Sequence, residues 1–143
     1  MSVVVSVPAG EYDLRAEILA FAEALLRVAG RADSELSLSL VGDSEIAELN
    51  AAHRSRSGPT DVLSFSLLEG DHADFRGSML GDVVIGLDVA RRQAEEQGVP
   101  LAEELQRLLV HGFLHLLGHD HEVPEEARRM RVAEERLWRE VAS

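Results

Sequence analysis

Hydrophobic and polar positions alternate with two different periods in the first part of the chain. A short β-branched run over residues 1–7 ends at a Pro-Ala-Gly segment, which predicts a strand followed by a turn. Apolar residues then recur at helical spacing as far as Gly30, with Asp13 as a candidate cap, and predict a helix ending near 28. Leucines alternate with serines over 35–41, which predicts a strand with one face in water. The helical stripe consists of Leu14, Ile18, Phe21, Leu25 and Val28.

The rest of the chain adds two more strands and several helices. Strands alternating with helices, followed by a helical second half, are typical of an α/β or α+β fold. We therefore expect a single domain over 1–143 in which about five helices pack on a small mixed sheet of about four strands. Strand order is not readable from the pattern. The later elements are expected as a short helix after Asp43 or Ser44, a turn over 54–60, a strand over 62–67, an acidic loop over 69–77, a strand over 80–87, and helices over 88–97, 101–117 and 124–141.

Composition narrows the classes of function. The chain has 143 residues and a formal net charge of -12, and all of its basic residues are arginines. This balance disfavours a general nucleic-acid coat or a protein that binds anionic membranes. No apolar run approaches the length of a membrane span, so a cytoplasmic protein is expected. Because cysteine is absent, a metal would have to be held by histidines and carboxylates.

Four of the six histidines lie in one short segment at the end of the most apolar predicted helix. His111 and His115 are four residues apart, so a helix would place both side chains on one face, where they can share an ion. The third ligand is His119 or His121. Gly118 is a natural helix terminator, which favours His121 after a turn. Three neutral imidazoles with an open fourth position are typical of a catalytic zinc site.

Other interpretations of this segment remain open. The histidines can be read as surface residues of an acidic protein, and His119 faces solvent as readily as it serves the site. Asp120 is either a partner of a ligand histidine or a turn residue. The histidine spacing is also that of metzincin peptidases, which place a glutamate general base directly after the first histidine. Gly112 stands at that position here, so a different metal-assisted hydrolysis is favoured.

A second group of candidate residues surrounds Arg54. The segment 49–60 contains Arg54 and Arg56 and no acidic residue, which is a local reversal of charge in an acidic chain. Arginine is permanently charged and matches phosphate geometry. Asp61 and Asp82 are candidates to orient Arg54 or a ligand histidine, because an acid among apolar residues tends to be paired. General-base work by either aspartate is the alternative. The acidic pairs of the last helices, such as Glu134-Glu135, are interpreted as solvated faces.

These segments together resemble a known family, the YbeY endoribonucleases, which act in bacterial rRNA maturation and ribosome quality control. The resemblance covers essentially the whole length, and its motifs occur in the family's order. They are Leu49-Asn-x-x-His-Arg54 leading to Pro59-Thr-Asp-Val-Leu-Ser-Phe65, then Gly81-Asp-Val-Val-Ile85, then His111-Gly-x-Leu-His115-Leu-x-Gly-x-Asp-His121.

The resemblance implies one zinc ion per chain, held by His111, His115 and His121, with Arg54 and His115 as catalytic residues. It implies a single-strand-specific endoribonuclease that matures the 3′ end of 16S rRNA. The expected partners are single-stranded RNA and the ribosome or its small-subunit proteins, with no membrane and no DNA. Two departures are visible, since His53 and His119 stand where the family often has tyrosine.

Two alternative functions are kept. One is a zinc hydrolase of peptides or small amides. The absence of a glutamate at position 112, where glycine stands, argues against it. The other is a ribosome assembly factor whose zinc is structural and is closed by His119 or Asp120. Nickel or copper is also conceivable, because imidazole accepts several metals.

Overall fold

The structure is a computed structural model that describes residues 3–54, 56–66, 79–118 and 123–143. Within these ranges it contains four strands and five helices, so the predicted α/β class is confirmed. In chain order they are β1 (Val3–Ser6), α1 (Tyr12–Val28), β2 (Glu35–Val41), α2 (Asp43–Arg54), β3 (Val62–Ser66), β4 (Met79–Gly86), α3 (Leu87–Gln97), α4 (Leu101–Leu116) and α5 (Pro124–Ala142).

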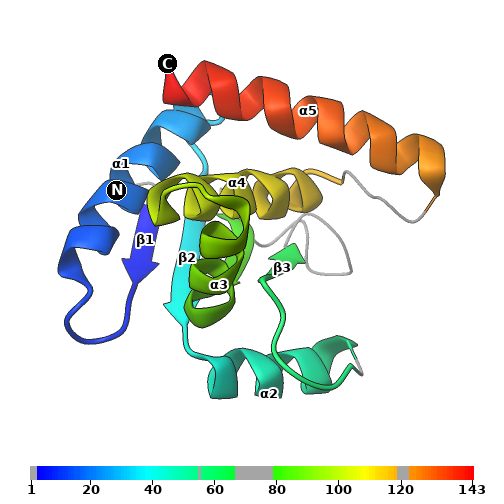
Figure 1. The fold of residues 1–143 in the computed structure, drawn as a ribbon. Coiled ribbons are helices and arrows are strands. Elements are labelled where there is room, and N and C mark those ends of the chain that lie inside the picture. The colour runs from blue at the N-terminus through cyan, green and yellow to red at the C-terminus, as the bar shows by residue number, and fades with distance from the viewer. Residues whose placement is uncertain (1–2, 55, 67–78, 119–122) are drawn as a thin grey trace.

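The four strands form one mixed sheet in the order β1-β2-β4-β3. β1 pairs with β2 and β2 pairs with β4 in parallel, whereas β3 lies antiparallel to β4 at the edge. β4 therefore occupies an inner position, which agrees with a sequence that is apolar apart from Asp82 and the two glycines. In Figure 1 the chain rises from α2 at the bottom of the view into β3, so the segment after α2 leads into the edge strand.

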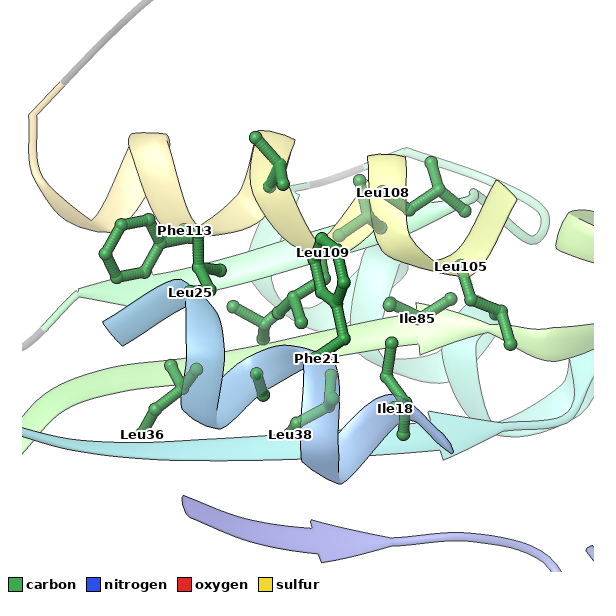
Figure 2. Packing of buried hydrophobic residues seen from close by; sticks show 14 of the residues in the cluster. Ile18, Phe21, Leu25, Leu36, Leu38, Ile85, Leu105, Leu108, Leu109 and Phe113 are labelled. Atoms are coloured by element: carbon green, nitrogen blue, oxygen red, sulfur yellow. The ribbon is translucent and has the colours of Figure 1, made fainter. Parts of the chain in front are cut away.

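Helices cover the sheet unequally. The main core lies where α1 and α4 pack on the strands, and Figure 2 shows their apolar side chains directed toward the sheet. α5 packs on α1 and α4 rather than on the strands, and forms an outer layer (Figure 1). On the opposite face a smaller cluster joins α2 to β3 and β4; it contains Val41, Ile46, Leu63 and Val84.

A register shift at the start of β4 decides which side chains face α4. The β2–β4 pairing passes from Glu35 opposite Met79 to Leu36 opposite Gly81, so one residue of β4 is bulged. Beyond the bulge, Val83 lies opposite Ser64, and both contact α4. Their neighbours along the strands point to the other face, where α2 packs.

The ends of the helices agree with the sequence prediction in most details. Gly118 follows α4 with a φ of 98°, a left-handed conformation that favours glycine and ends the helix there as predicted. Asp13 was expected as the cap of the first helix, but α1 begins at Tyr12 and its cap position is Glu11. Val28 was expected in the buried stripe and is exposed, because Leu25 and Leu26 take the inward positions of the last turn. No helix in the described ranges is both long and apolar enough to span a bilayer.

Candidate active site

Helix α4 carries the two histidines that lead the candidate metal site. His111 and His115 are half-buried, and their ring centroids are 4.8 Å apart with the ring planes inclined by 70°. The opposite side of the helix is anchored by fully buried residues such as Leu109 and Phe113 (Figure 2). The spacing therefore does place both imidazoles together, one turn apart on a rigid support.

Both histidines open onto a pocket of about 390 Å³ between α4, β3 and the segment after α2. This volume lies within the range of about 300–1,000 Å³ that is usual for ligand sites. The pocket brings together five of the predicted site residues, from two segments that lie far apart in the sequence. Its described lining consists of Arg54, Arg56, Thr60, Asp61, Val62, Ser64, Ser66, His111 and His115.

The arginines contribute positive charge to this pocket. Arg54 ends α2, Arg56 follows it, and both side chains are exposed to solvent. Within the described ranges, neither guanidinium group has a carboxylate or hydrogen-bond partner. Unlike the arginines that form ion pairs on α5, these two are available to an anion that enters the pocket.

A buried asparagine that sequence reasoning had not assigned to the site fixes the arginine segment. Asn50 is 4% exposed, and its amide donates a hydrogen bond of 3.0 Å to the carbonyl oxygen of Gly58. The backbone N–H of Arg56 in turn donates to the Asn50 carbonyl at 3.5 Å. A buried polar residue is normally hydrogen-bonded, and here its partners shape the loop beside the pocket. The signal in the sequence was a polar residue on the inward side of a short amphipathic helix.

Two serines of β3 fasten the sheet to the histidine helix. Ser64 Oγ donates to the carbonyl oxygen of Gly112 at 3.1 Å, and Ser66 Oγ donates to that of Leu116 at 3.2 Å. A Cβ atom added to Gly112 would lie 2.8 Å from Val83 Cγ1 and 3.0 Å from Ser64 Oγ. The residue after the first histidine therefore packs directly on the sheet, and the site has no room there for the glutamate of a metzincin.

Gly112→Ala should destabilise the protein. An alanine in a helix interior normally gains up to about 1 kcal/mol over glycine, whereas overpacking a core costs about 1–3 kcal/mol. The close approach to β3 and β4 makes the second effect the larger, so we expect the free energy of unfolding to fall by about 1–2 kcal/mol. Urea denaturation measures this, and Ala102→Gly on the same helix calibrates the propensity. A gain in stability for Gly112→Ala would contradict the packing.

Glu134 was interpreted from the sequence as part of a solvated face, and the structure corrects this. Its Oε1 atom lies 2.5 Å from Nδ1 of His111, and both side chains are only about a quarter exposed. Glu135 was interpreted in the same way, and it forms an ion pair of 2.7 Å with Arg107 of α4. Contacts between α4 and α5 do not affect the local periodicity of the sequence, so the hydrophobic pattern could not predict them.

The two aspartates of the prediction have different environments. Asp61 is half-buried in the pocket wall and accepts a weak hydrogen bond from Gln93 at 3.5 Å. Asp82 was expected to be a paired acid among apolar neighbours, but it is exposed and lies opposite Phe65, on the sheet face turned away from α4. No described residue forms an ion pair or hydrogen bond with Asp82. The strand alternation that buries Val83 turns Asp82 outward, so it cannot orient a histidine of α4.

A second carboxylate lies near Asp61. Burial in α4 raises the pKa of Glu104 above its ordinary value, and the negative charge of Asp61 raises it further. Arg107 opposes this shift, and Glu103 adds to it. Within the described lining of the pocket, Asp61 supplies negative charge whereas Arg54 and Arg56 supply positive charge, so an anion is favoured beside the arginines.

Three of the predicted site residues, His119, Asp120 and His121, lie outside the described residues. α4 ends at Leu116, before His119, so the histidine pair is not extended by another turn of this helix. Within the described ranges no group of three or more metal-binding side chains is found. The described donors are two imidazoles with no thiolate nearby, a set that suits zinc and needs at least one further ligand.

Comparisons with known proteins agree with this architecture. Residues 9–142 match the family model described as Endoribonuclease YbeY. A protein of that name from Anaeromyxobacter sp. (strain Fw109-5) is 50% identical over 118 residues, which cover 82% of this chain and 60% of that protein. Another from Heliobacterium modesticaldum is 48% identical over 115 residues, covering 75% and 69%. A solution structure of a Thermotoga maritima protein is similar with a TM-score of 0.61 and 26% identity, covering 96% of this chain and 90% of that one.

Proposed function

The chain belongs to the YbeY endoribonuclease family, and on this premise we propose that it is a zinc-dependent endoribonuclease that cleaves single-stranded RNA. The observation that carries the proposal is the pocket in which a histidine pair shares the lining with two arginines that form no ion pair with any described residue. Hydrolysis of a phosphodiester requires a nucleophile at neutral pH and stabilisation of negative charge on the phosphoryl oxygens. The pocket contains side chains suited to both tasks.

In this proposal His111, His115 and His121 hold one zinc ion. When bound, zinc supplies Lewis acidity and lowers the pKa of coordinated water toward neutrality. The two described histidines fit this role, because they share one face of α4 and both line the pocket. His119 and Asp120 are proposed to flank the site without filling the open coordination position.

The protein side chains then position the RNA. Arg54 binds the phosphate that is cleaved, and Arg56 contacts a neighbouring part of the backbone. Asp61 is the one acid among the described lining residues, so it is the described candidate to accept a proton in the pocket. The described lining of the pocket is mostly polar and contains no phenylalanine, tyrosine or tryptophan, which suits backbone recognition better than base stacking.

The wider role follows from the resemblance. We propose that the protein acts in the cytoplasm on the 3′ end of 16S rRNA, as part of rRNA maturation and ribosome quality control. The net charge of -12 repels RNA over most of the surface, which favours a ribosomal or protein partner for targeting. A single domain over 1–143 is proposed to contain the whole activity.

A peptide or amide hydrolase with the same zinc is the second candidate. A peptidase with the metzincin spacing would require a glutamate general base directly after the first histidine. Gly112 fills that position, and its contacts with Val83 and Ser64 exclude a larger side chain. This observation favours RNA over peptide substrates.

The purified chain tests the proposal directly. It should contain about one zinc per chain and cleave a labelled single-stranded RNA, but not the same RNA in a duplex. Removing the metal with a chelator should abolish cleavage, and zinc should restore it. Metal analysis and denaturing gels measure both results, with a peptide panel assayed in parallel. Cleavage of peptides alone, or RNA cleavage that survives complete loss of metal, would refute the proposal.

A further inference from the structure

Helix α5 reaches the candidate metal site through one carboxylate. Glu134 Oε1 lies 2.5 Å from Nδ1 of His111, a hydrogen-bond distance. In a neutral imidazole one ring nitrogen carries the proton and the other is free. A proton on Nδ1, donated to Glu134, leaves Nε2 unprotonated, with its lone pair available for coordination, in a residue that lines the pocket.

Contacts made by the residues that follow Glu134 hold this part of α5 against α4. Arg107 of α4 forms an ion pair of 2.7 Å with Glu135, and its guanidinium lies 3.9 Å above the ring of Trp138. Trp138 Nε1 donates a hydrogen bond of 3.1 Å to Oε1 of Gln106, also on α4. Figure 1 shows α5 passing over α4, and these contacts fix the register of the two helices at Glu134. Such support is what a precise hydrogen bond to a ligand requires.

We propose that Glu134 is a positioning residue of the metal centre. It fixes the tautomer and the ring orientation of His111, so that Nε2 is presented to the ion. Outer carboxylates of this kind raise the basicity of a ligand histidine, and their loss typically weakens metal binding by about 10–100-fold. The inference rests on the proposed zinc site and adds α5, whose residues lie far from the histidine motif in sequence.

A purely structural role makes a different prediction. If the pair only joined α5 to α4, its removal would lower the stability of the metal-free protein and leave zinc affinity unchanged. The two roles are therefore separated by measuring the dissociation constant for zinc and the thermal midpoint of the metal-free protein on the same variants.

The test compares Glu134→Ala and Glu134→Gln with the unchanged full chain, by competition for zinc against a chromophoric chelator. We expect zinc binding about 10–100-fold weaker for alanine, and an intermediate loss for glutamine, which keeps the size and one acceptor oxygen. Glutamine also preserves the packing, so it reports affinity if the alanine variant folds poorly. Glu140→Ala is the matched control, because it removes an exposed α5 carboxylate and its ion pair with Arg136.

The outcomes separate the two proposals. Zinc affinity unchanged in both Glu134 variants, with or without a lower thermal midpoint, would overturn the positioning role while the zinc site stands. An equal loss in Glu140→Ala would also overturn it, because the effect would then come from the charge of the helix. If the unchanged chain itself binds no zinc, the proposed function fails, and the role of Glu134 fails with it.

Discussion

His115→Ala should remove zinc binding and RNA cleavage together. His115 lines the pocket and shares its face of α4 with His111, so its loss leaves an incomplete set of ligands. The effect should exceed the about 10–100-fold losses seen when only a partner of a ligand is removed. We expect cleavage to fall by more than about 100-fold, to the background of the assay. Metal content per chain and the rate on labelled single-stranded RNA measure the two losses.

His53→Ala is the matched control for this experiment. His53 is an exposed residue of α2 that contacts the ring of Phe65 and does not line the pocket. It should therefore keep its zinc and most of its activity. A His115→Ala protein that retains zinc but loses activity would assign the metal to other ligands. Full activity without zinc would refute metal-dependent cleavage.

The sequence predicted those features that depend on local physical chemistry. The histidine spacing required only helix geometry, and the end of α4 required only the conformational freedom of Gly118. The charge reversal around Arg54 was likewise visible as composition. In each case neighbouring residues determine the outcome, so the pattern contains the information.

The features that could not be predicted depend on contacts between distant segments. The interpretation of Asp82 failed because a run of apolar residues does not show which strand face each neighbour takes, and the bulge at the start of β4 sets this. Glu134 looked like any acid of a charged helix until α5 packed against α4. The strand order β1-β2-β4-β3 and the antiparallel direction of the edge strand also depend on which strands pair. The local periodicity of the sequence does not show this pairing.

The packing of β3 explains why the candidate residues meet at all. Ser64 and Ser66 fasten this edge strand to α4, and the segment that precedes it brings Arg54 and Asp61 to the same pocket. The arginine end and the histidine end are therefore joined through one short strand. Catalysis that needs both a metal and a phosphate-binding cation depends on this junction, since small displacements of reacting groups are costly.

Arg54→Ala should lower RNA cleavage strongly while leaving the zinc in place. Within the described part of the chain the Arg54 guanidinium has no acidic partner, so its removal breaks no structural ion pair. Groups that stabilise charge developing on reacting oxygens are typically worth about 10²–10³ in kcat. We expect a loss of that order, with zinc content and thermal midpoint unchanged. Single-turnover cleavage at saturating enzyme separates this loss from weaker RNA binding.

Two further variants decide what the arginine contributes. Arg54→Lys keeps the positive charge but lacks the planar pair of donors. Cleavage faster than that of Arg54→Ala would show that the charge itself contributes. Cleavage as slow as that of Arg54→Ala would show that two parallel hydrogen bonds to the phosphate are needed. Arg128→Ala on α5 removes one positive charge outside this pocket, and should cost little. If Arg128→Ala and Arg54→Ala weakened cleavage equally, the effect would be general attraction to RNA, and it would disappear at high salt. A loss confined to Arg54 and persisting at high salt would assign this residue to the cleaved phosphate.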